Sequence, residues 1–179
     1  MMMQNKEPQV ILVDTCDREI GSAAKSEAHN SPRLHRAFSV FLYHGDSMLI
    51  QQRADEKYHS GGLWSNSCCS HPRPGESLAQ AVPQRMQEEL GFYCPVEEIF
   101  EFSYFCRFHD SLYEYEYDHV FLGEYNGTFT LNPEEAKAAR WITLDELERE
   151  LVENPTAYSV WFLICAPRVI AEIRNRAKR

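Results

Sequence analysis

The chain lacks any apolar run close to the roughly 20 residues that a bilayer-spanning helix needs, so we expect no membrane segment. Residues 1–8 contain no apolar stretch ahead of a small-residue cleavage site, which favours a cytosolic location. No Cys-x-x-Cys pair is present, and this argues against a structural zinc ribbon. The six cysteines could pair, but a reducing compartment favours free thiols.

Positive charge is also scarce, because 18 Lys and Arg residues face 27 Asp and Glu residues for a net charge of -9. Proteins that bind nucleic acids or anionic membranes rely on broad basic surfaces, so we expect neither partner. A hydrophobic content of 44% and a charged content of 25% are typical of globular proteins. With 179 residues and no repeat or linker, the chain predicts one domain over residues 1–179, and we expect a monomer or a weak dimer.

Hydrophobic periodicity and turn residues predict a mixed α and β fold. Strands are expected at residues 10–13, 34–43, 48–53, 100–108, 112–125 and 140–142. Within residues 34–43, Phe38 and Val40 fall on one face, and His35 and Ser39 fall on the other. Asn126-Gly127 is a dipeptide typical of hairpin turns, so we expect a hairpin there.

Three helices are expected, each with a recognisable start. The first begins after Ser77, buries apolar residues at intervals of four and ends at Gly91. Its buried stripe consists of Leu78, Val82, Met86 and Leu90. Thr143 opens a capping box for the second helix, which runs to about residue 151, and the third helix starts near Ser159.

Residues 64–72 place two adjacent thiols, Cys68 and Cys69, close to the imidazole of His71. A Cys-Cys pair is more often buried filler than a nucleophile, but this segment is too short and polar for ordinary core. Successive side chains of an extended segment point to opposite faces, so the two thiols cannot both enter one site. Because His71 lies two residues beyond Cys69, we expect those two side chains to share a face.

Three histidines and two carboxylates along the chain could together form a metal site. Glu114 and Glu116 lie two residues apart in a predicted strand and therefore face the same side. Neutral imidazoles combined with carboxylates suit Zn, Mn or Fe. The candidates are His29, His35, His71, Glu114 and Glu116. A solvated strand face is the alternative for the glutamates, and we expect ordinary solvated or hydrogen-bonded side chains at His44, His59, His109 and His119.

Six segments in a fixed order carry a resemblance to a known family. They are residues 33–39, 64–72, 75–76, 88–91, 113–116 and 159–161. Over roughly residues 9–165 the chain resembles the type I isopentenyl-diphosphate isomerases, members of the Nudix superfamily. The resemblance implies an α/β fold, namely an α/β/α sandwich with a mixed central sheet. It also implies isomerisation of isopentenyl diphosphate to dimethylallyl diphosphate through a carbocation-like intermediate.

The resemblance further implies two metals and a set of phosphate-binding cations. One divalent metal, Mn²⁺ or Zn²⁺, would take the three histidines and both carboxylates named above as ligands. A substrate-linked Mg²⁺ would be held by Glu89 and the backbone carbonyl of Cys69. The cations at positions that contact the diphosphate of this small-molecule substrate are Lys25, Arg53, Lys57 and Arg85.

The same resemblance assigns proton transfer to Cys69 and Glu116, which match the two proton-transfer residues of the family. Tyr104 would orient Glu116 or relay its proton. Trp161 would offer an aromatic face to the carbocation-like intermediate, with packing in an apolar helix as the alternative.

The chain departs from the Nudix hydrolase pattern within residues 70–91. Arg85 stands where the hydrolases have a metal-binding glutamate, and this disfavours a Nudix pyrophosphohydrolase. Ser70 replaces a frequent glycine, which would matter only if the backbone there needs a positive φ. A catalytically inactive Nudix-like interaction domain is the other alternative, and the presence of Cys69, Glu116 and Trp161 counts against it.

Overall fold

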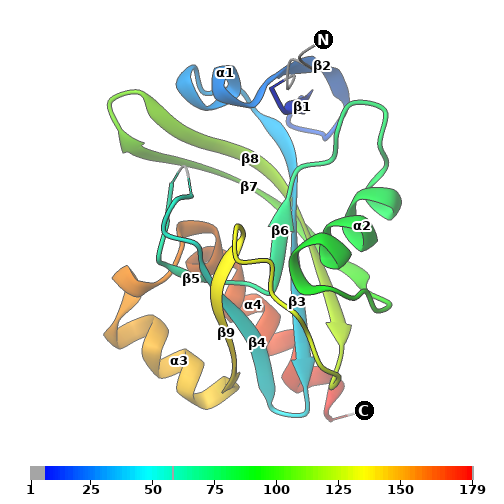
Figure 1. The fold of residues 1–179 in the computed structure, drawn as a ribbon, viewed down its shortest axis with the longest axis vertical. Helices are drawn as coiled ribbons and strands as arrows, with labels where there is room; N and C mark the ends of the chain where they lie inside the picture. The colour runs from blue at the N-terminus through cyan, green and yellow to red at the C-terminus, as the bar shows by residue number, and fades with distance from the viewer. Residues whose placement is uncertain (1–6, 58, 179) are drawn as a thin grey trace.

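The computed structural model of the protein describes residues 7–57 and 59–178, so most of the expectation for residues 1–8 lies outside it. Within these ranges, nine strands form one curled, mixed sheet with helices on both faces, and the predicted α/β/α sandwich is confirmed (Figure 1). The strands are β1 (Gln9–Val13), β2 (Glu19–Ala24), β3 (His35–His44), β4 (Ser47–Arg53), β5 (Trp64–Ser65), β6 (Cys68–Ser70), β7 (Glu97–His109), β8 (Leu112–Glu124) and β9 (Ala136–Thr143). The helices are α1 (Lys25–Asn30), α2 (Leu78–Leu90), α3 (Leu144–Glu153), the 3-10 turn Pro155–Ala157 and α4 (Val160–Arg176).

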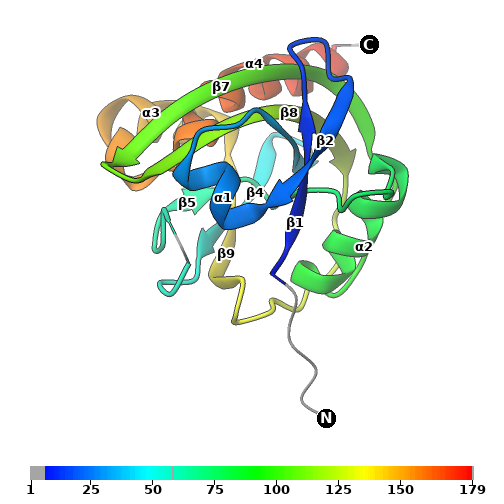
Figure 2. The same ribbon diagram turned by 90° about the horizontal axis from the view of Figure 1, so that it is seen from above.

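Strand β3 is the centre of the sheet. Along one side it pairs in parallel with β8, in a register that places His35 opposite Glu116. Along its other side it pairs antiparallel with β1, β6 and β4 in turn. The long strands β7 and β8 arch over this centre, as Figure 2 shows. Two different segments, β6 and β8, therefore flank the same central strand.

Helices α2 and α4 cover opposite faces of the sheet. Met86 and Leu90 of α2 pack with Phe38 of β3 in one buried cluster. Phe162 of α4 packs with Phe41 of β3 in the other. The alternation predicted for residues 34–43 is thus confirmed, because burial of apolar area fixes which side of the strand faces which helix. Both helices contribute to the site described below, α2 through Arg85 and Glu89 and α4 through Trp161.

The predicted helix starts and the predicted end of α2 are confirmed. Ser77 and Gln80 form a reciprocal capping box at the start of α2. Gly91 ends this helix with φ of 76°, a left-handed conformation that glycine adopts without a side-chain penalty. Thr143 Oγ1 accepts a hydrogen bond from the Glu146 amide at the start of α3. These local signals depend only on neighbouring residues, so the sequence suffices to locate them.

The expected hairpin at Asn126-Gly127 is wrong. Strand β8 pairs with β3 and β7, whereas β9 pairs antiparallel with β4. The intervening chain instead crosses the end of α2, where the Thr130 amide donates to the Leu90 carbonyl at 2.8 Å. Long-range strand pairing outweighs the preference of one dipeptide, because it buries whole rows of side chains.

Two further expectations concern the cysteines and the membrane segments. All six cysteines are free thiols, as predicted. Among the helices of the described ranges, none is both long enough and apolar enough to cross a bilayer.

Candidate active site and metal centre

A cavity of about 430 Å³ is lined by residues of both α2 and α4. It lies beside β3, β6 and β8 and is bordered by the loop that follows β4. All predicted site residues line it except His29 and His35, which are fully buried. The lining residues among the predicted set are Lys25, Arg53, Lys57, Cys69, His71, Arg85, Glu89, Tyr104, Glu114, Glu116 and Trp161.

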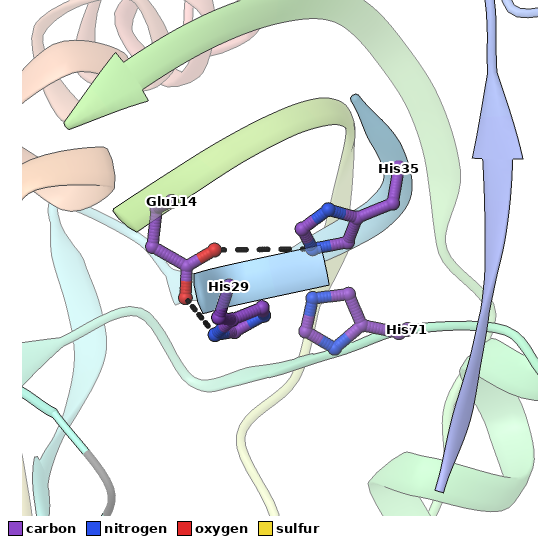
Figure 3. A group of neighbouring side chains, drawn as sticks. All are labelled: His29, His35, His71 and Glu114. Carbon is purple, nitrogen blue, oxygen red and sulfur yellow. Dashed lines mark ion pairs between the residues drawn. The ribbon is translucent and has the colours of Figure 1, made fainter. Parts of the chain in front are cut away.

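Four side chains converge at one end of this cavity with the spacing of a metal site. His29 comes from α1, His35 opens β3, His71 follows β6 and Glu114 lies on β8. One ligand atom from each lies within 4.8 Å of all the others. Figure 3 shows these side chains converging, with Glu114 paired to His29 and His35 at 3.5 and 3.9 Å. The fifth predicted ligand, Glu116, is also close, with its Oε1 3.8 Å from His35 Nε2.

The hydrogen bonds of His35 leave its inner nitrogen ready to bind a cation. His35 Nδ1 lies 2.8 Å from the Arg33 carbonyl oxygen, an acceptor, so Nδ1 carries the proton and Nε2 the lone pair. That buried Nε2 and the buried Glu114 Oε2 have no hydrogen-bond partner. Leaving such groups unsatisfied costs about 1–3 kcal/mol each. The donor set therefore fits a divalent cation with nitrogen and oxygen ligands.

His59 lies beside this cluster as a buried, hydrogen-bonded histidine, which is one of the two states expected for it from the sequence. Its Nε2 lies 2.5 Å from Glu114 Oε1, and its side chain is 8% exposed. Its ring stacks on Phe108 at 4.9 Å between centroids. The loop after β4 folds back over the cavity and carries His59 with it, an arrangement that no local periodicity indicates.

The other three histidines lie away from the cluster. His119 is held between Asp17 and Glu98, at 3.1 and 2.6 Å, as expected for a hydrogen-bonded histidine. His44 and His109 are exposed at the ends of β3 and β7.

Burial keeps the clustered imidazoles neutral. It lowers the pKa of His29 to about 2, with the charges of His71 and Lys25 acting in the same direction. It also lowers the pKa of His71 to about 4, although Glu116 opposes the shift. Neutral imidazole is the form that binds metals, so protons compete weakly for these nitrogens.

The two glutamates of β8 differ in their proton affinity. Burial and the neighbouring charge of Glu116 raise the pKa of Glu114 well above its usual value. Burial acts in the same direction on Glu116, but hydrogen bonds from His71 and Tyr104 hold its pKa well below the usual value. His71 Nε2 lies 2.7 Å from Glu116 Oε1, and the Tyr104 hydroxyl donates to Oε2 at 2.6 Å. Tyr104 thus fixes the orientation of the Glu116 carboxylate.

The thiols of β6 point to opposite faces, as predicted from an extended segment. Cys68 is fully buried against α2, whereas Cys69 lines the cavity together with His71. Burial raises the pKa of Cys69 to about 12, despite the opposing charge of Arg53. Arg53 Nη1 lies 3.8 Å from the Cys69 sulfur, so a neutral thiol faces the cavity beside a guanidinium.

Trp161 lines the cavity and is also part of the buried core cluster of α4, so the packing alternative holds. The residue is 4% exposed and its indole nitrogen donates to Asn66 Oδ1 at 3.0 Å. The Arg53 guanidinium lies 5.1 Å from the ring centroid. The aromatic face therefore contacts a cation in this structure.

A second polar group forms around Glu89, at the end of α2. Arg85 Nε donates to Glu89 Oε1 at 2.7 Å, and Gln51 Nε2 donates to Oε2 at 3.1 Å. The buried Gln51 Oε1 lines the same cavity and has no hydrogen-bond partner. These oxygens suit a hard cation such as Mg²⁺. Gln51 is not among the site residues predicted from the sequence, because nothing local distinguishes a glutamine in a strand from an ordinary polar residue.

Ser70 lies in β6, and its φ is not positive, so a serine there is unstrained.

Arg85 also pairs with Glu88 at 3.1 Å. Arg85, which stands where the hydrolases have a glutamate, is therefore paired with both Glu88 and Glu89.

The fold and this site define a Nudix-type protein, and residues 33–162 match the NUDIX domain family. Structures with the same fold include DR0079 from Deinococcus radiodurans, with a TM-score of 0.75 and 19% identity over 89% of this chain and 98% of that one. The MutT protein from Methanosarcina mazei Go1 gives a TM-score of 0.61 and 16% identity over 82% of this chain and 96% of that one. At these identities the likeness concerns the fold alone.

Within that class the chain belongs to the isopentenyl-diphosphate Delta-isomerase family. It is 49% identical to isopentenyl-diphosphate Delta-isomerase 1 of Aromatoleum aromaticum, over 92% of this chain and 94% of the relative. It is 46% identical to the isopentenyl-diphosphate Delta-isomerase of Burkholderia multivorans, over 87% of this chain and 89% of the relative. The family predicted from the six sequence segments is therefore confirmed.

Proposed function

We propose that the protein isomerises isopentenyl diphosphate to dimethylallyl diphosphate, using Cys69 and Glu116 for proton transfer. The observation that carries this proposal is the position of these two groups in one cavity. Cys69 comes from β6 and Glu116 from β8, which pair with opposite edges of β3. A substrate lying across β3 would therefore have one proton-transfer group on each side.

The double bond moves by two proton transfers. One group delivers a proton to the terminal alkene carbon, which leaves positive charge on the neighbouring tertiary carbon. The other group removes a proton from the carbon on the far side, and the new double bond forms there. Each transfer by a positioned side chain contributes about 10²–10⁴-fold to the rate. Tyr104 keeps Glu116 aimed through its 2.6 Å hydrogen bond and is positioned to relay its proton.

The intermediate charge needs an aromatic face and the absence of a nucleophile. Trp161 supplies the face from the floor of the cavity, where burial limits the access of water. Arg53 now lies against that ring. We infer that the diphosphate draws the Arg53 guanidinium toward its oxygens and leaves the indole to the hydrocarbon end of the substrate.

The diphosphate end is bound by the cations that line the cavity, namely Lys25, Arg53, Lys57 and Arg85. Glu89 and the Cys69 carbonyl would hold Mg²⁺ against it, which would neutralise phosphate oxygens. At the other end, His29, His35, His71, Glu114 and Glu116 would hold Mn²⁺ or Zn²⁺, which would supply positive charge beside the Glu116 carboxylate. The six free thiols support a reducing compartment, so we place the enzyme in the cytosol.

Incubation of the protein with isopentenyl diphosphate and Mg²⁺, followed by proton and phosphorus NMR, tests the proposal. The expected result is a conversion of the terminal alkene signals to dimethylallyl signals, with the diphosphate intact. Release of phosphate with an unchanged alkene would contradict isomerisation and instead indicate a Nudix hydrolase.

A further inference from the structure

A carboxylate that the predicted site does not include, Glu135, lies among the cations expected to bind the diphosphate. Its Oε2 lies 2.6 Å from Arg85 Nη2 and also pairs with Lys57 Nζ. The Glu135 side chain is 18% exposed and lines the cavity. One carboxylate oxygen therefore contacts two of the four cations expected to bind phosphate.

The backbone of Glu135 is tied to both sides of the cavity. The Ala54 amide, at the end of β4, donates to the Glu135 carbonyl at 3.0 Å. The Asn132 amide, in the same loop, donates to the Glu89 carbonyl at 3.0 Å. The loop thus links the end of α2 to the segment that carries Lys57. This anchoring makes the position of Glu135 a property of the fold rather than of one long side chain.

Carboxylates offset the positive charges of Lys57 and Arg85 in the free protein. Burial would raise the pKa of Glu135, but Lys57 and Arg85 hold it below its usual value, so the group is anionic at neutral pH. Arg85 also contacts Glu89 at 2.7 Å. It also pairs with Glu88 at 3.1 Å. Lys57 and Arg85 therefore face three carboxylates, and this part of the cavity offers no net positive charge to an anion.

A phosphate oxygen and a carboxylate oxygen compete for the same N–H donors of lysine and arginine. A diphosphate that reaches Lys57 and Arg85 must displace Glu135 and must also approach the charge of Glu89. A divalent cation that enters with the diphosphate compensates both carboxylates. A free anion carries no such compensation.

We propose that Glu135 is an internal counter-anion that makes diphosphate binding conditional on an accompanying divalent cation. This inference rests on the proposed function, because it assumes that the cavity accepts a diphosphate. The new element is that Glu135 discriminates against metal-free diphosphate. Glu135 acts here as a specificity-determining residue and needs no contact with the reacting carbons.

Calorimetric binding of inorganic pyrophosphate, with Mg²⁺ and with chelator, tests this role without measuring activity. The wild type should bind far more tightly with Mg²⁺ than with chelator. Glu135→Gln keeps the shape and removes the charge, so its affinity in chelator should rise by roughly tenfold, with less than about a threefold change in Mg²⁺. Glu135→Asp keeps the charge and should keep the wild-type dependence on Mg²⁺.

The matched control is Glu134→Gln, which removes the same charge from the neighbouring, exposed residue. It should bind as the wild type does in both conditions. An equal gain in Glu134→Gln would overturn the inference, since the effect would then reflect net charge alone. Weaker binding of Glu135→Gln in both conditions would also overturn it, because Glu135 would then only hold Lys57 and Arg85 in place.

The outcome for the wild type separates this inference from the proposed function. If the wild type does not bind pyrophosphate even with Mg²⁺, the proposed diphosphate site is wrong and the inference falls with it. If the wild type binds with Mg²⁺ but Glu135→Gln behaves identically in both conditions, only the role of Glu135 is wrong.

Discussion

His59 shows how much one side chain can add to a site. It contacts the ligand candidate Glu114 at 2.5 Å, stacks on Phe108 and lies 5.9 Å from the Trp161 ring between centroids. The same histidine therefore connects the candidate metal ligands with an aromatic ring that lines the cavity. A partner of this kind orients a carboxylate ligand and raises its affinity for metal.

We expect His59→Ala to weaken binding of Mn²⁺ or Zn²⁺ by about 10–100-fold, because it removes an orienting partner of Glu114 while the ligand candidates themselves stay. Competition of each variant with a chelator of known affinity measures the loss. His44→Ala, at the exposed end of β3, is the control and should bind metal as the wild type does. An unchanged affinity in His59→Ala would show that the contact with Glu114 has no role in metal binding.

Two of the residues missed from the sequence, His59 and Glu135, lie in largely polar loop segments. His59 lies in a turn-rich loop, and Glu135 follows Asn132 and Pro133 in another. Such segments normally form solvated loops, and nothing local shows that they fold back over a cavity. By contrast, Glu114 and Glu116 could be predicted to face one side, because strand periodicity alone fixes that relation.

At the scale of elements, β6 shows that the alternation of side chains in a short strand can be predicted from the sequence. Cys68 and Cys69 are adjacent, yet one packs against α2 and the other faces the cavity. The register confirms this arrangement, since Cys69 lies opposite Ser39 and Cys68 opposite Val40. The hairpin expected at Asn126-Gly127 failed because it required knowledge of which strands pair, and pairing is decided by distant residues.

We expect Cys69→Ala to lower kcat by at least about 10²-fold and to abolish solvent deuterium incorporation into the substrate, since one proton-transfer group is lost. Cys68→Ala is the matched control in the same strand. It should keep most activity and lose roughly 1 kcal/mol of unfolding free energy from a small cavity in the α2 core. NMR of the reaction in D₂O and urea unfolding measure the two effects. Full activity in Cys69→Ala would mean that another residue transfers the proton.

At the scale of the whole molecule, the candidate metal ligands come from parts of the chain that are far apart in sequence. His29 lies on α1, His35 on β3, His71 beyond β6 and Glu114 on β8. The unfolded chain does not hold these groups together, so a metal bound by them stabilises the folded state by mass action. The same cluster carries the cost of a buried His35 nitrogen and a buried Glu114 oxygen without hydrogen-bond partners, which a bound cation would relieve.

We expect Mn²⁺ or Zn²⁺ to raise the thermal midpoint of the chelator-treated protein by about 5–10 °C. Free metal at a hundredfold excess over Kd contributes about 2.7 kcal/mol, and each kcal/mol shifts the midpoint of a chain of this size by about 2–4 °C. Glu114→Gln removes a carboxylate ligand but keeps its volume, so most of the shift should disappear. Glu124→Gln makes the same change at the exposed end of β8 and should keep the full shift. Differential scanning calorimetry of the three proteins, with metal and with chelator, gives the comparison. Equal shifts in the wild type and in Glu114→Gln would place the metal elsewhere on the protein and would leave the buried His and Glu cluster without the role proposed for it.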